Sequence, residues 1–125
     1  MKRLPKLSDL HRHLDGSLRL TTLRELVQQP EELQPEKLLF FKGMGLQDAL
    51  SRFATTLSVL QTAKRVTRVA SEICEDAEAE GVSSLEIRFA PQLHKKASME
   101  TIVDAALEGI AQRAGLILCG LYGET

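Results

Sequence analysis

Residues 7–16 have the sequence LSDLHRHLDG, and the interpretation of the whole chain starts from this stretch. Its alternation predicts a strand from Leu7 to Leu14, because successive side chains of a strand point to opposite faces. One face would carry Leu7, Asp9, His11 and His13, and the other Ser8, Leu10, Arg12 and Leu14. The residues that follow, Asp15 to Ser17, are typical of a turn.

Two histidines stand near the carboxyl end of this predicted strand. Because His11 and His13 are two residues apart, their side chains should project on the same side, roughly 6–7 Å apart at the backbone. Two imidazoles placed in this way can converge on one metal ion, and imidazole suits zinc. Asp15 is a candidate to anchor the metal shell or a substrate hydroxyl, and Gly16 lets backbone approach a ligand closely. The spacing alone also fits two neighbouring surface histidines that bind nothing.

The rest of the chain alternates expected helices and strands. Apolar residues at helical spacing predict helices from Thr21 or Thr22 to Gln29, Leu46 to Leu60, Thr62 to Gly81 and Ser98 to Gly115. Apolar runs predict strands at Ser83–Ala90 and Leu116–Leu121. Residues 30–45 are expected to be irregular.

Two of these helices have clear apolar faces and end signals. Thr62 is an expected N-cap, and Gly81 stands where a C-terminal cap belongs. The first buried face would contain Val66, Val69, Ala70, Ile73, Cys74 and Ala77. The second would contain Ile102, Val103, Ala106, Leu107, Ile110 and Ala111.

Helical connections between short apolar strands imply parallel pairing with right-handed crossovers. The fold class is therefore α/β, either an open doubly wound sheet or the first part of a (β/α)8 barrel. A length of 125 residues favours the open sheet, because a barrel typically needs about 250 residues.

Composition excludes several classes of protein. The net charge is −1 and the basic residues are scattered, which argues against nucleic acid as a partner. No apolar run reaches the ~18 residues of a membrane helix, and the start of the chain is not a secretory signal. The two cysteines are expected to be reduced thiols in a cytoplasmic protein. They form no Cys-x-x-Cys pair, which excludes a deaminase of the cytidine deaminase type.

Three segments together resemble the adenosine deaminase family of metal-dependent amidohydrolases. The sequence LPK at residues 4–6 followed by LHRHLDGSLR at residues 10–19 resembles the family's opening signature. LEIRFAP at residues 85–91 resembles its second strand, and GLILC at residues 115–119 its third. The resemblance reverses the preference for an open sheet. It implies that residues 1–125 are a single partial domain, about three β/α units of a TIM (β/α)8 barrel.

The resemblance also assigns roles to residues. His11 and His13 would be ligands of one Zn²⁺ per complete site, and Asp15, with Gly16 beside it, would contact the sugar end of a nucleoside. A helix with Leu46, Ala49, Leu50 and Phe53 would form an apolar wall against the purine, with Leu50 and Phe53 binding substrate. Periodicity alone favours ordinary core packing for these apolar residues. Better-known family members tend to have an aromatic at Ala49 and a Ser at Ala90, so the pocket here is expected to differ.

The activity implied is zinc-dependent hydrolytic deamination of adenosine or a related aminopurine to the 6-oxo product and ammonia. The remaining metal ligands, the proton-shuttle glutamate and the orienting histidine would come from later strands. No catalytic residue is therefore expected in this chain, and the isolated chain should be inactive. One alternative is an adenine or modified aminopurine nucleoside deaminase. Another is a non-catalytic remnant that binds metal or a partner.

Four further expectations concern residues outside the histidine motif. Glu86 and Arg88 should form an inward-facing ion pair, because they lie opposite Leu85, Ile87 and Phe89. His94 should be a solvated loop residue. Cys119 should be a small core residue. The open edge of the sheet at Leu116–Leu121 should allow self-association.

Overall fold

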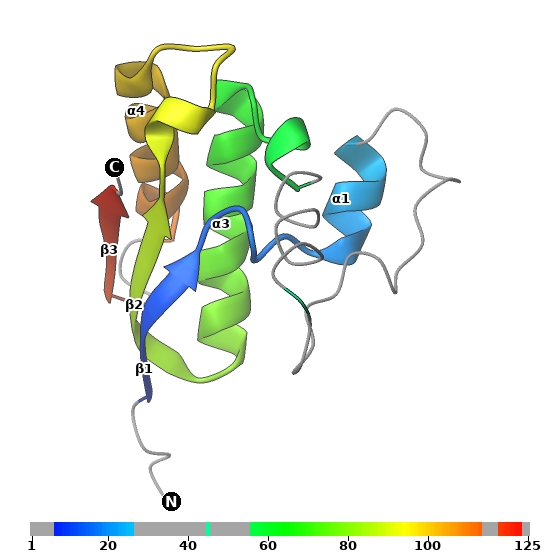
Figure 1. The fold of residues 1–125 in the computed structure, drawn as a ribbon. Coiled ribbons are helices and arrows are strands. Elements are labelled where there is room, and N and C mark those ends of the chain that lie inside the picture. Colours follow the sequence, from blue (N-terminus) through cyan, green and yellow to red (C-terminus); the bar gives the residue numbers. More distant parts are fainter. Residues whose placement is uncertain (1–6, 27–44, 46–55, 114–117, 124–125) are drawn as a thin grey trace, which may run out of the picture.

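The structure of the protein is a computed structural model that describes residues 7–26, 45, 56–113 and 118–123. The strands are β1 (Leu7–His13), β2 (Val82–Phe89) and β3 (Leu118–Gly123). The helices are α1 (Leu20–Leu26), α3 (Ala63–Ala79) and α4 (Met99–Ala111), with a 3-10 turn η3 (Pro91–Leu93) after β2 (Figure 1). Residues 56–59 are also helical.

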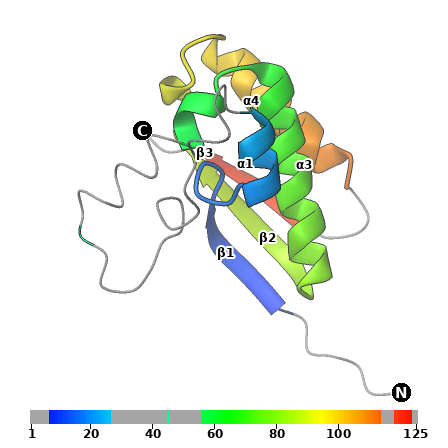
Figure 2. The same ribbon diagram turned by 90° about the vertical axis from the view of Figure 1, so that its right-hand side faces the viewer.

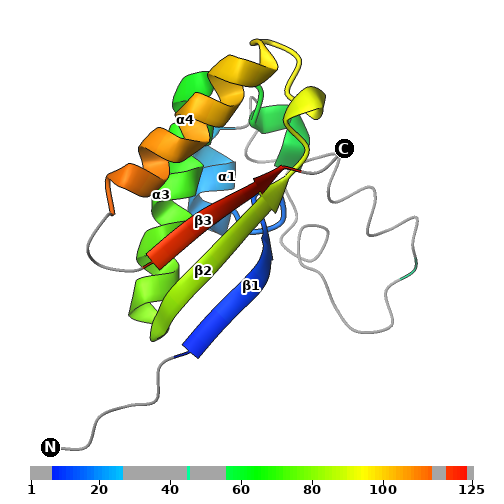
Figure 3. The ribbon, with the colours of Figure 1, turned by 90° about the vertical axis from the view of Figure 1, so that its left-hand side faces the viewer.

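The three strands form one parallel sheet in the order β1-β2-β3, so strands that follow each other in the chain are neighbours. Helices α3 and α4 pack on the same face of the sheet, and α1 lies on the same side of it (Figure 2, Figure 3). A doubly wound sheet carries helices on both faces, whereas a β/α barrel carries them on the outer face alone. The prediction of an α/β chain with the first units of a barrel is confirmed.

Local capping signals fix both ends of α3 and the start of α4. The Thr62 hydroxyl accepts a hydrogen bond from the Arg65 backbone N–H, and the Ser98 hydroxyl accepts one from Thr101. Gly81 follows α3 with a φ of 86°, in the region that favours glycine. The expected N-cap Thr62, the predicted helix start at Ser98 and the glycine at the end of α3 are confirmed.

The core lies between the sheet and the helices. The whole predicted face of α3 is buried, and it packs with Leu14, Leu85, Ile87, Phe89 and Ile102. The extent of β3 differs from the prediction, because the strand continues to Gly123. Residues 116–117 and 46–53 lie outside the described residues, as does the expected end of the first helix. None of the helices in the described part of the chain combines the length and apolar character needed to cross a membrane.

The buried face of α4 differs from the prediction. Leu107 is 47% exposed and Ala111 is exposed, while Ala105 and Gly109 are buried instead. The reason is a close approach to α3 that only small residues allow. A Cβ atom built on Gly109 would lie 2.3 Å from the carbonyl oxygen of Thr67. The packing of α4 on α3 therefore selects small residues over the larger apolar ones.

Candidate metal and substrate site

The strand that carries the two histidines contains a bulge. Asp9 pairs with Leu85 and Arg12 with Ile87, so β1 uses one residue more than β2 over this interval. Asp9 and Arg12 thereby come to the helix side of the sheet, where their side chains form an ion pair of 2.7 Å. The prediction that Asp9 shares a face with the histidines is wrong, because the bulge breaks the alternation.

The imidazoles of His11 and His13 meet on the other side of β1. Their Nε2 atoms are 3.1 Å apart, and their ring centroids are 4.9 Å apart. Two nitrogens bound to one tetrahedral zinc at 2.0–2.1 Å would be roughly 3.3 Å apart. The pair therefore fits two adjacent coordination positions of one tetrahedral zinc ion. The predicted convergence of the two rings is confirmed. Within the described ranges, no group of three or more His, Cys, Asp or Glu residues could hold a metal ion.

Backbone and side-chain contacts hold this part of β1 in place. Leu14 N–H donates to the Arg88 carbonyl at 2.8 Å, and Arg88 Nε donates to the Leu10 carbonyl at 3.3 Å. The Asp9 carboxylate accepts from the His11 backbone N–H at 3.2 Å. Burial alone would raise the pKa of Asp9, but this hydrogen bond and those from Arg12 outweigh it and leave the pKa lowered. An ionised Asp9 thus fixes the His11 backbone within the bulge and the Arg12 side chain beside it.

The inner face of β2 is polar beside the histidines. Arg88 pairs in register with His13, and its guanidinium forms an ion pair with Glu86 at 3.0 Å. The same guanidinium lies 4.8 Å from the ring centroid of Tyr122 on β3. The expected ion pair is confirmed, whereas the sequence did not indicate the contact with Tyr122.

Asp15 and Gly16 form a turn directly after the histidines, as predicted. Beyond the turn, Arg19 fixes the chain to α3 through hydrogen bonds of 2.7–3.0 Å with Asp76. A further bond of 2.8 Å joins Arg19 to Glu75, and these contacts raise the pKa of the guanidinium. Sequence reasoning assigned no role to Arg19. The signal available in the sequence was the pair of neighbouring acidic residues, Glu75 and Asp76, on the predicted helix.

His94 lies inside the protein, so the prediction of a solvated loop histidine is wrong. Its side chain is 2% exposed, Nδ1 forms a hydrogen bond with the Leu60 carbonyl, and the ring stands edge to face against Phe89. Residues 59–60 come from a distant part of the chain and cover the turn after β2. Local sequence between Leu93 and Lys95 gives no indication of this cover.

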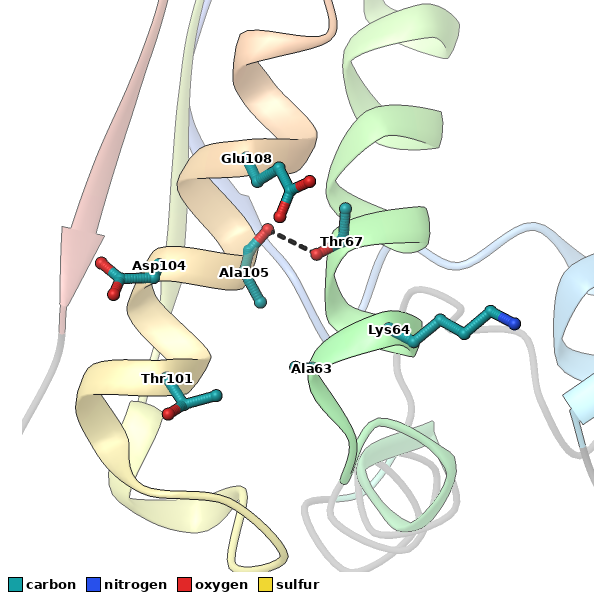
Figure 4. Close-up of a pocket in the computed structure, with 7 residues that line it drawn as sticks. All are labelled: Ala63, Lys64, Thr67, Thr101, Asp104, Ala105 and Glu108. Atoms are coloured by element: carbon teal, nitrogen blue, oxygen red, sulfur yellow. Dashed lines mark hydrogen bonds between the residues drawn. The ribbon is translucent and has the colours of Figure 1, made fainter.

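A separate open groove of about 400 Å³ lies between α3 and α4 (Figure 4). The Thr67 hydroxyl crosses it and donates to the Ala105 carbonyl at 2.9 Å. The groove is lined by Ala63, Lys64, Thr67, Thr101, Asp104, Ala105 and Glu108. None of the predicted site residues lines it, so the histidine pair is the better candidate site. The predicted substrate wall with Leu50 and Phe53 lies outside the described residues.

The chain is similar to proteins of one family. The family model described as adenosine deaminase matches residues 5–120. A probable adenosine deaminase of Dictyostelium discoideum is 45% identical over 139 residues, which cover 97% of this chain and 18% of that protein. An adenosine deaminase of Enterococcus faecalis is 36% identical, with 97% of this chain and 41% of that protein covered.

Solved structures have the same fold. An adenine deaminase from Arthrobacter aurescens has a TM-score of 0.74 at 26% identity, and the matched region covers 94% of this chain and 38% of that protein. The N6-mAMP deaminase of Arabidopsis has a TM-score of 0.74 at 27% identity, covering 94% of this chain and 40% of its own. A Burkholderia ambifaria amidohydrolase with bound Zn resembles the fold at 21% identity and a TM-score of 0.75. The matched region covers 96% of this chain and 35% of that protein. The chain spans less than half the length of each of these relatives.

Proposed function

The chain belongs to the adenosine deaminase family, and we propose that it supplies the first β/α units of a zinc-dependent aminopurine deaminase. The observation that carries this proposal is the 3.1 Å separation of His11 Nε2 and His13 Nε2 at the carboxyl end of β1. This end of a parallel strand is where β/α barrels place their catalytic groups. Residues 1–125 would form one partial domain of the complete barrel.

His11 and His13 would hold zinc jointly with ligands from later strands. Zinc, when bound, would supply the Lewis acid that makes water a nucleophile at neutral pH. Asp9, through the His11 backbone N–H, and Arg88, through the Leu10 carbonyl, keep the bulge of β1 in the shape that brings the imidazoles together. In this proposal the contribution of the chain is to position metal and substrate, while proton transfer belongs to residues of later strands.

The substrate would be a purine that loses its amino group as ammonia. We assign Asp15 and Gly16, in the turn after the metal ligands, to the sugar end of a nucleoside. Leu50 and Phe53 would contact the purine ring. We also propose a cytoplasmic location, consistent with the two free cysteines.

A second candidate substrate class is adenine or a modified aminopurine nucleotide. The support for it comes from the names of two similar solved structures, the adenine deaminase and the N6-mAMP deaminase. A small residue at Ala49, where an aromatic is usual in the family, would accommodate such a difference in the purine. A domain that binds metal or a partner without catalysis is the remaining alternative.

Calorimetric titration of the 125-residue chain with zinc at neutral pH tests the metal site. We expect weak binding, because two imidazoles leave the ion mostly hydrated. His11→Ala and His13→Ala should each abolish zinc binding. His94, the histidine outside the pair, remains in both variants and serves as an internal control. Nanomolar affinity that survives His11→Ala would place the metal elsewhere and overturn the proposal.

An ammonia-release assay with adenosine, adenine and N6-methyl-AMP tests the division of labour. The 125-residue chain with zinc should show no turnover, because the loss of the proton shuttle alone lowers the rate by about 10²–10⁴-fold. Robust zinc-dependent turnover would contradict the proposed division. In a polypeptide that carries these residues with the complete barrel, Asp15→Ala should weaken nucleosides more than adenine. The exposed Asp104→Ala is the matched control. Equal losses for base and nucleoside would remove Asp15 from the sugar site.

A further inference from the structure

The two cysteines of the chain meet between a helix and a strand. Cys74 on α3 and Cys119 on β3 are 45 residues apart in sequence, yet their Sγ atoms are 3.8 Å apart. Both are free thiols, and the chain contains no other cysteine. Neither residue belongs to the histidine site or the turn after it. The fold therefore builds a dithiol that the proposed deamination does not use.

The two thiols have different surroundings. Cys74 is buried in the core, whereas Cys119 is half-buried on a strand whose second edge pairs with no described residue. A hydrogen bond with Cys119, with a contribution from the positive charge of Arg113, lowers the pKa of Cys74. The same hydrogen bond, together with burial, raises the pKa of Cys119. The thiolate form is thus favoured on Cys74 over Cys119.

Arg113 is held against α3 by two side chains that neighbour Cys74 in the sequence. Its guanidinium donates to the Ser71 hydroxyl at 3.3 Å and to the Glu75 carboxylate. Ser71 and Glu75 lie on the same helix as Cys74, and the charge of Arg113 contributes to the lowered pKa of Cys74. A positive charge near a thiolate is a common feature of reactive cysteines.

From the juxtaposition of these two sulfurs we propose that Cys74 and Cys119 are a redox-sensitive pair that closes to a disulfide on exposure to a peroxide. The Cys74 thiolate attacks one oxygen of the peroxide, the O–O bond breaks, and a sulfenic acid forms on Cys74. Hydroxide leaves and becomes water with the proton that the Cys74 thiol lost on ionising. The Cys119 thiol then attacks the Cys74 sulfur, the S–O bond breaks, and water leaves. Two thiols and one hydrogen peroxide thus give one disulfide and two waters.

Closing the bond requires little movement. A disulfide has a sulfur–sulfur distance of about 2.05 Å, so the sulfurs need to approach by less than ~2 Å from their separation of 3.8 Å. The product would link β3 to α3 and so fasten the outer strand of the sheet to the helix layer. In a reducing compartment such a bond would be transient, as expected of a redox sensor.

Peptide mass spectrometry of the native chain treated with hydrogen peroxide tests the proposal. Trypsin should yield residues 69–88 linked to residues 114–125, with two hydrogen atoms lost and the link reversed by dithiothreitol. Mixing ¹⁵N-labelled and unlabelled chains distinguishes links within one chain from links between chains. The link should form at least about tenfold faster in native protein than in urea, because only the fold holds the thiols together. Equal rates, or links only between chains, would overturn the proposal.

Single-cysteine variants test the order of the steps. In Cys119→Ser, dimedone should trap a sulfenic acid on Cys74 after peroxide treatment. In Cys74→Ser, labelling of Cys119 should be about tenfold slower, because the charge of Arg113 lowers the pKa of Cys74 and does not act on Cys119. The reverse order of reactivity would contradict the assignment of Cys74 as the attacking thiol. Oxidised wild-type protein should also melt about 5–15 °C higher than reduced protein, and an unchanged melting temperature would contradict the link between α3 and β3.

Discussion

Gly109 on α4 lies so close to Thr67 on α3 that a Cβ atom on Gly109 would stand 2.3 Å from the Thr67 carbonyl oxygen. The same Cβ would be 2.8 Å from the Cβ of Ala70. Because the obstacle is backbone, no change of rotamer relieves it. This contact determines how closely the two helices that cover β2 pack, and it leads to the first prediction.

Gly109→Ala should destabilise the protein by about 1–3 kcal/mol, because overpacking forces the helices apart. Helix propensity alone would favour alanine by about 1 kcal/mol. The sign of the change in the free energy of unfolding therefore decides whether the contact is as close as described. Urea denaturation followed by circular dichroism measures it. Gly120→Ala is the matched control, because no atom lies within 4 Å of its Cβ position. Equal stability of the two variants would contradict the close packing.

His94→Ala should lower the free energy of unfolding by about 2–4 kcal/mol. The substitution leaves a cavity beside Phe89 and removes the hydrogen-bond partner of the Leu60 carbonyl. His11→Ala, at an exposed histidine, should change stability by less than about 0.5 kcal/mol. Thermal melts of the two variants side by side provide the comparison. A smaller loss for His94→Ala than for His11→Ala would show that His94 is not buried.

Acid should destabilise the protein through Asp9 and Glu75. Hydrogen bonds with Arg19 and the charge of Arg113 lower the pKa of Glu75, and the pKa of Asp9 is also lowered. When the folded pKa is lower than the unfolded one, the unfolded chain binds more protons, so stability rises with pH. The ordinary values are 3.8 for Asp9 and 4.5 for Glu75. The stability that the two ionised carboxylates contribute should therefore be complete above these ordinary pKa values. It should be lost as the pH falls through their lower pKa values in the folded protein.

Melting temperatures between pH 6 and pH 2.5 measure this loss. Arg19→Gln should lower the melting temperature at pH 6 by about 2–5 °C and reduce the further loss in acid, because Glu75 then loses its first partner. Leu107→Ala, at an exposed position of α4, should leave the acid dependence unchanged. A pH dependence that is identical in wild type and Arg19→Gln would contradict the role of Arg19.

The outer edge of β3 should cause self-association. In the described part of the chain β3 pairs with β2 alone, and Tyr122 on it is 50% exposed. Unpaired strand edges tend to pair with another chain. Light scattering should detect oligomers at high concentration. Tyr122→Glu should reduce them, because an edge charge opposes pairing while the carboxylate keeps a partner in Arg88. A monodisperse wild-type monomer with strong amide protection throughout β3 would contradict an open edge.

Sequence alone determined the order of the elements, both ends of α3, the start of α4 and the buried face of α3. It also determined that His11 and His13 share one side of a strand. Each of these features depends on residues a few positions apart: a 3.6-residue period, a cap that bonds its own first turn, or a two-residue spacing. Such local physics can be deduced from the residues themselves, which explains why these predictions are confirmed.

Only the tertiary structure decided the features that join distant segments. The pairing with β2 places the bulge that turns Asp9 toward Arg12, and residues 59–60 bury His94. Likewise, α3 selects Gly109 over Leu107 for the buried face of α4, and the sheet brings Cys119 to Cys74. Each outcome depends on which atoms of another element occupy the space beside a residue. Periodicity within one segment carries no information about those atoms, so only packing could settle these positions.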